Sequence, residues 1–84
     1  MDSKSIKLLV DAGAIKSVSI VADGATVHAQ ITTGSGELQP ATTLKGAIKT
    51  WSTIDSAAKW VRSLGIGRMK LNVAKWSPDQ KGML

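Results

Sequence analysis

The chain has 84 residues, with 11 Lys and Arg against six Asp and Glu, one His and no Cys, for a formal net charge of +5. This length fits one small domain, and a hydrophobic content of 43% excludes a disordered tail. The lack of cysteine excludes disulfides, thiolate metal sites and cysteine nucleophiles, and it favours the cytoplasm. No apolar run approaches the roughly 18 residues of a membrane span, and the first residues lack the features of a signal peptide.

The positive charge is concentrated in the second half of the chain. Residues 1–44 hold three lysines against four acidic residues, whereas residues 45–84 hold eight basic residues against two acidic ones. Such asymmetry is typical of a surface that binds nucleic acid or another polyanion. The competing interpretation is that these lysines only keep the domain soluble.

The first predicted element is a short helix over residues 3–12. Ser3 or Ser5 is a suitable N-cap, because a side-chain oxygen there accepts a backbone N–H that the helix leaves unpaired. Gly13 follows as a suitable C-terminal stop. One apolar stripe is formed by Ile6, Leu9 and Val10.

A β-hairpin is predicted over residues 15–32, with Asp23-Gly24 as its two-residue turn. Apolar residues alternate with polar ones on both sides of this turn, and the register that the turn sets puts the apolar residues on one face. The predicted cross-strand pairs are Ala22–Ala25, Ile20–Val27 and Val18–Ala29.

Residues 37–51 are predicted to form one bent strand or a second hairpin. Pro40 excludes a regular central strand at its position, and Gly46 indicates a bulge or turn. The expected apolar anchors are Leu38, Leu44 and Ile48.

The strongest helical pattern covers residues 52–64. Ser52 or Thr53 is the predicted N-cap, and Ser52 with Asp55 resembles a capping box. Gly65 ends the helix. Its apolar face comprises Ile54, Ala57, Ala58, Val61 and Leu64.

A strand then follows over residues 68–74, with Met69, Leu71 and Val73 pointing inward. The order is therefore α-β-β-β(β)-α-β, which predicts a single α+β domain over residues 1–76. We expect a mainly antiparallel sheet of three to five strands, with two helices on one face and a polar face opposite. Residues 77–84 are predicted to be a flexible C-terminal tail.

The pattern of reactive side chains argues against an enzyme. His28 is the only histidine, no carboxylate neighbours it in sequence, and it falls on the polar side of the predicted hairpin. A zinc site needs three or four ligands, and a serine nucleophile needs a base with an orienting partner. The glycine pairs near residues 34–36 and 65–67 do not lead into a helix as a phosphate-binding loop does. We therefore expect no catalytic site, metal, cofactor or small-molecule substrate.

Two sets of residues are candidates for binding a partner. Basic residues bind phosphates when they converge on one surface, although the helical and strand residues are expected to point in opposite directions if the helix covers the sheet. Tryptophans pack in the core, stack on bases or anchor a protein interface. The nucleic-acid-binding candidates are Lys45, Lys49, Lys59, Arg62, Arg68, Lys70 and Lys75, and the interface candidates are Trp51, Trp60 and Trp76.

Three blocks of sequence carry a resemblance to a known family. They are residues 8–15 (LLVDAGAI), residues 44–58 (LKGAIKTWSTIDSAA), and residues 64–68 (LGIGR) leading to residues 71–76 (LNVAKW). In these blocks the chain resembles the small ParC-type partition-associated proteins of plasmids and related mobile elements. The resemblance implies an accessory role near plasmid maintenance genes and assigns no functional residue.

We therefore expect a non-enzymatic accessory protein of a plasmid or mobile element. It would bind DNA, or a DNA-bound partition or replication protein, through a basic surface in residues 45–75. The alternative is a protein–protein adaptor without nucleic-acid contact, for example a homodimer through an exposed strand edge or a Trp-lined face. Binding to phosphates weakens steeply between about 50 and 200 mM salt, whereas an apolar interface does not.

Overall fold

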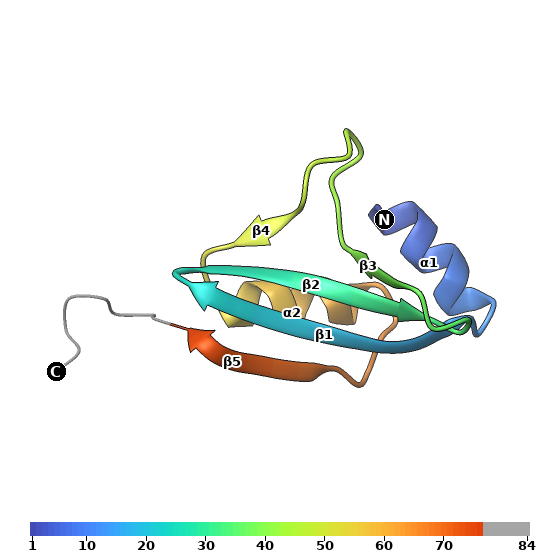
Figure 1. Ribbon diagram of the computed structural model, residues 1–84. Helices are drawn as coiled ribbons and strands as arrows, with labels where there is room; N and C mark the ends of the chain where they lie inside the picture. The colour runs from blue at the N-terminus through green and yellow to red at the C-terminus, as the bar shows by residue number, and fades with distance from the viewer. Residues whose placement is uncertain (77–84) are drawn as a thin grey trace, which may run out of the picture.

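The computed structural model describes residues 1–76 as two helices and a five-stranded mixed sheet (Figure 1). This confirms the predicted α+β class and the order of elements. The prediction of a flexible tail at residues 77–84 lies outside the described residues. In chain order the elements are α1 (Ser3–Asp11), β1 (Ile15–Gly24), β2 (Thr26–Thr33), β3 (Leu38–Pro40), β4 (Thr50–Trp51), α2 (Ile54–Ser63) and β5 (Lys70–Trp76).

The sheet has the strand order β3-β2-β1-β5, and β4 also pairs with β2. Neighbouring strands are antiparallel except for β5, which runs parallel to β1. A parallel partner cannot follow through a tight turn, so the chain crosses the sheet through α2 before β5 begins. Figure 1 shows α2 lying behind β1 and β2, with β5 along the lower edge of the sheet.

Both helices pack on one face of the sheet, as predicted. α2 packs against β1, β2 and β4, and α1 inserts Ile6 into the same core. The opposite face carries polar side chains such as Ser19, His28 and Gln30. The buried core consists of Ile6, Val18, Ile20, Ala22, Val27, Ala29, Ile31, Ala41, Ala57, Val61, Leu64 and Ile66.

The β1–β2 hairpin forms with a register different from the predicted one. Asp23 pairs with Thr26, so the two-residue turn is Gly24-Ala25 and not Asp23-Gly24. Gly24 has φ of +62°, as the first central residue of a type II′ turn requires, while Ala25 keeps a negative φ. The observed pairs include Ala22–Val27, Ile20–Ala29 and Val18–Ile31.

The helix caps correct one prediction and confirm another. Asp2, and not Ser3 or Ser5, is the N-cap of α1, because Asp2 is extended and its Oδ1 accepts the backbone N–H of Ser5 at 2.9 Å. Thr53 caps α2 and accepts the N–H of Ser56 at 3.1 Å.

The capping box predicted between Ser52 and Asp55 is therefore wrong. Thr53 occupies the N-cap position, so the Asp55 carboxylate lies one position too early to reach back to it. Asp55 pairs instead with Lys59, with Oδ2 3.2 Å from Nζ.

Residues 42–49, here called the arm, form the second hairpin. Thr42 and Ile48 bridge its base, and the turn closes where the N–H of Gly46 donates to the carbonyl of Thr43 at 3.0 Å. The arm projects away from the sheet (Figure 1). Two predicted anchors, Leu44 and Ile48, are consequently 73 and 58% exposed rather than buried. The third, Leu38, lies on β3 opposite Thr32, on the polar face of the sheet, and is 60% exposed.

The last strand begins at Lys70 and is exposed along its length. Met69 packs against the core as predicted, but Leu71 and Val73 are 54 and 42% exposed. The prediction that they point into the core is wrong because α2 covers β1, β2 and β4, and β5 lies beyond them at the sheet edge.

Candidate functional site

A lysine and two tryptophans form a cluster between β4 and α2. Trp60 lies at the border of the apolar face of α2, and Trp51 lies on β4; their ring centroids are 5.2 Å apart at an interplanar angle of 51°. The Lys49 Nζ lies 5.5 Å from the Trp51 ring and 5.6 Å from the Trp60 ring. Cation–π attraction of this kind holds the ammonium group in one place while it remains at the surface.

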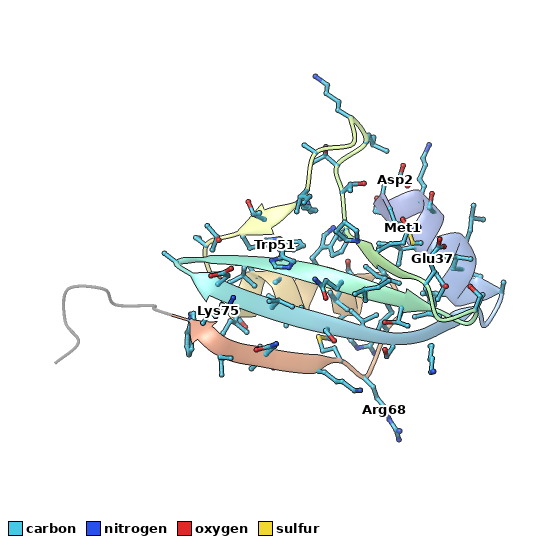
Figure 2. The ribbon with its side chains drawn as sticks, viewed as in Figure 1. Met1, Asp2, Glu37, Trp51, Arg68 and Lys75 are labelled. Carbon is cyan, nitrogen blue, oxygen red and sulfur yellow. The ribbon has the colours of Figure 1, made fainter. Side chains whose placement is uncertain are left out.

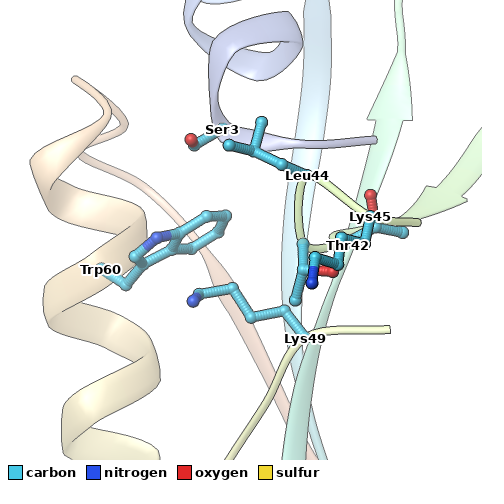
Figure 3. A pocket seen from close by; sticks show the side chains of 7 residues that line it. Ser3, Thr42, Leu44, Lys45, Lys49 and Trp60 are labelled. Atoms are coloured by element: carbon cyan, nitrogen blue, oxygen red, sulfur yellow. The ribbon is translucent and has the colours of Figure 1, made fainter. Parts of the chain in front are cut away.

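Two surface pockets adjoin this cluster, and they share Ser3 and Trp60. The first has a volume of about 440 Å³, and Figure 3 shows Trp60 projecting from α2 toward Lys49 inside it. The second has a volume of about 530 Å³ and lies between α1 and α2. The two adjoining pockets are here called, together, the lysine groove. Their lining residues are Ser3, Lys4, Lys7, Thr42, Thr43, Leu44, Lys45, Lys49, Trp60, Ser63 and Leu64.

The lysine groove is positively charged. Two of its lysines come from α1 and two from the arm, and no Asp or Glu is among its lining residues. Within residues 1–76 the single ion pair is Asp55–Lys59, so no groove lysine is ion-paired with a carboxylate there. Asp2, next to Ser3, accepts the backbone N–H of Ser5, which lowers the pKa of its carboxyl group, and this carboxylate lies outside the lining of the groove.

The lining of the groove matches the chemistry of a phosphate chain. Ammonium groups and hydroxyl groups are the side-chain donors that proteins most often place on phosphate oxygens. The hydroxyls come from α1 and the arm, because the Ser63 hydroxyl of α2 already donates to the carbonyl of Trp60 at 2.6 Å. The indole of Trp60 adds a flat apolar surface beside the cations. The groove therefore suits a polyanion better than a neutral ligand.

The structure does not bring the predicted basic residues together on one surface. Lys45, Lys49 and Trp60 line the groove, with Trp51 packed beside them. Lys59 is paired with Asp55, and Arg62 lies exposed on α2. The remaining candidates belong to the opposite edge of the sheet, where Figure 2 shows residues 68 and 75 near the two ends of β5; they are Arg68, Lys70, Lys75 and Trp76.

Sequence reasoning missed Lys4 and Lys7. Both fall in the half of the chain with a net negative charge, but α1 brings them to the arm and α2. Their spacing of three places them on one face of a helix, and this was the available signal.

The structure adds nothing to the candidates for catalysis. His28 lies on the sheet face away from the helices, with its Nε2 3.5 Å from the Nε2 of Gln30. Among residues 1–76 no group of three or more potential metal ligands gathers. The described helices are all too short or too polar to cross a membrane.

None of three comparisons with known proteins gives a match. No protein-family model matches the chain, no curated protein matches it, and no solved structure matches it. The assignment of function therefore depends on the geometry and charge of the lysine groove.

Proposed function

We propose that this chain is a non-enzymatic accessory protein of a plasmid or mobile element that binds DNA in the cytoplasm. The lysine groove contacts the phosphate backbone. The observation that carries the proposal is the convergence of Lys4, Lys7, Lys45 and Lys49 around Trp60, with no acidic residue in the lining. The accessory role is supported by the resemblance of residues 8–15, 44–58, 64–68 and 71–76 to ParC-type partition-associated proteins.

Phosphate contacts supply most of the affinity in binding that does not depend on DNA sequence. The groove offers four such contacts from separate elements, and Lys49 is held in advance by two indole rings. A cation held in place loses less conformational freedom on binding than a freely rotating lysine. Trp60 offers a surface for a sugar or an unstacked base next to the phosphates.

The first test is a fluorescence anisotropy titration with a short random duplex between 50 and 200 mM salt. If all four lysines contact phosphates, the logarithm of the binding constant falls with a slope of about −3.6 against the logarithm of the salt concentration. That slope corresponds to about a hundredfold loss of affinity over this range.

Two variants of equal net charge locate the binding surface. The double variant Lys45→Gln/Lys49→Gln removes two groove lysines, and we expect the salt slope to decrease by about 1.8. The matched control Lys16→Gln/Lys70→Gln removes one lysine of β1 and one of β5, outside the lining of the groove, and its slope should match that of the parent chain. Equal losses in the two variants would contradict a groove site. An absence of binding at 50 mM salt would reject DNA binding. It would favour the alternative function, a protein–protein adaptor without nucleic-acid contact.

A further inference from the structure

β5 is a sheet edge with two different faces. One side of the strand pairs with β1, and no strand of the described chain pairs with the other. Leu71 is the register neighbour of the buried Ile20, so its side chain points to the helix side of the sheet. The register shifts between Asn72 and Lys75, where the Asn72 Oδ1 already accepts the backbone N–H of Ala74 at 3.0 Å. Lys70 and Lys75 are the register neighbours of Ser19 and Asp23 and point to the polar side.

Three cations gather where β5 begins. Pairing between β1 and β5 starts at Ser19 and Lys70, and the two strands diverge before this point. A hollow of about 310 Å³ lies there, with no carboxylate in its lining. Its lining residues are Lys16, Ser17, Val18, Arg68, Met69 and Lys70.

We propose that the free edge of β5 binds an extended acidic segment of a partner protein as an added strand. An edge strand presents a row of unpaired N–H and C=O groups, and an extended polypeptide is the ligand that pairs with such a row. Carboxylates of the segment lie at the hollow beside Lys16, Arg68 and Lys70. Its apolar side chains cover Leu71 and Val73. This inference is independent of the lysine groove and gives the molecule a second, protein-binding edge.

Charge decides between an acidic partner and a second copy of this chain. Residues 68–76 hold three cations and no Asp or Glu, so a second β5 strand placed alongside in either direction would bring only positive charges together, and such like-charge contacts are costly. DNA would neutralise the cations but would leave the edge amides and exposed apolar side chains without partners. An acidic strand satisfies the backbone, the apolar side chains and the charge together.

The test is an amide-shift NMR titration of the full chain with two synthetic heptapeptides. One alternates Glu and Val, and the other replaces every Glu by Lys. We expect the Glu–Val peptide to shift the amides of residues 16–19 and 70–76, and the Lys–Val peptide to leave them unchanged. In the variant Arg68→Glu/Lys70→Glu, whose two sites are exposed, the preference should reverse, with at least a tenfold loss of affinity for the Glu–Val peptide.

Three outcomes would overturn the proposal. In the first, the Glu–Val peptide causes no shifts at this edge. In the second, the β5 amides shift with protein concentration alone, which assigns the edge to a second copy. In the third, the random duplex displaces the peptide, which assigns the edge to nucleic acid. The variant Lys45→Gln/Lys49→Gln separates this proposal from DNA binding in the groove, because it should bind the peptide with unchanged affinity.

Discussion

Trp60 shows how one side chain serves the core and the surface. Its position at the border of the apolar face of α2 lets one part of the indole pack against the core, while another part lines the lysine groove. The sequence offered core packing and partner binding as alternatives for this residue. A half-buried aromatic at the rim of a helix face fulfils both.

Asp2 makes the stability of α1 dependent on pH. The N–H of Ser5 donates to its carboxylate, and this hydrogen bond lowers the pKa of Asp2 below its ordinary value of 3.8. A depressed pKa stabilises the folded state above the unfolded value, and this contribution is lost as pH falls through the folded value. We expect the protection of α1 amides against hydrogen exchange, relative to the intrinsic exchange rate at each pH, to fall below about pH 4. It can be followed by NMR hydrogen exchange.

The matched variant for this effect is Asp2→Asn. Asparagine keeps a capping oxygen but does not titrate, so α1 should remain formed and its protection should lose the acid-dependent step. An acid-dependent step of the same size in the variant would assign the pH dependence to another group.

At the level of elements, the start of α2 shows which of two adjacent residues, Ser52 or Thr53, is the N-cap. Thr53 Oγ1 accepts the N–H of Ser56, whereas Ser52 precedes the cap. We expect Thr53→Ala to lower the free energy of unfolding by about 1 kcal/mol. Urea denaturation of Thr53→Ala and of the parent chain measures this difference in the free energy of unfolding.

Ser52→Ala is the control for Thr53→Ala, since Ser52 is exposed. Its free energy of unfolding should stay within about 0.5 kcal/mol of that of the parent chain. A larger effect at Ser52 than at Thr53 would place the cap where the sequence pattern suggested a capping box.

The hairpin shows what local pattern predicts and what it leaves open. Alternation correctly assigned Val18, Ile20 and Ala22 to the buried face, yet the pairing register was displaced. The turn moves by one residue, which changes every cross-strand pair but leaves each side chain on its own face. Asp-Gly and Gly-Ala are both acceptable turns, so the apolar pattern could not choose between them.

β5 shows a second limit of local pattern. Alternating Leu71 and Val73 indicate a strand with one buried face, and the strand does form. Burial depends on whether α2 reaches over that strand. This is a property of the crossover and not of residues 68–76 themselves.

At the level of the whole molecule, a single core joins both helices to the sheet. Ile6 is fully buried, so Ile6→Ala should lower the free energy of unfolding by about 2–5 kcal/mol. A domain of this size has a total stability of only about 4–13 kcal/mol. Urea denaturation should therefore show a large fall in the midpoint with one cooperative transition.

Leu8→Ala is the matched control on the same helix. Leu8 is 71% exposed, and its removal should change the free energy of unfolding by less than about 0.5 kcal/mol. Similar losses in the two variants would mean that α1 does not dock through Ile6.

The candidate site was only half predictable because it is assembled by tertiary packing. Lys45 and Lys49 were found from the charge of the second half of the chain. Lys4 and Lys7 reach them because Ile6 docks α1 and because the N–H of Thr42 donates to the carbonyl of Met1 at 2.8 Å. No local pattern connects segments about 40 residues apart.

The parallel pairing of β1 with β5 also has a consequence during synthesis on the ribosome. About 45 residues separate the end of β1 from the start of β5. At about 5–20 residues per second, the nascent chain carries β1 for roughly 2–9 s before its second partner is made. During that interval the strand that becomes central in the finished sheet is itself an open edge. A ribosome that pauses before residue 70 therefore prolongs a stage at which an unpaired strand edge can pair with another chain.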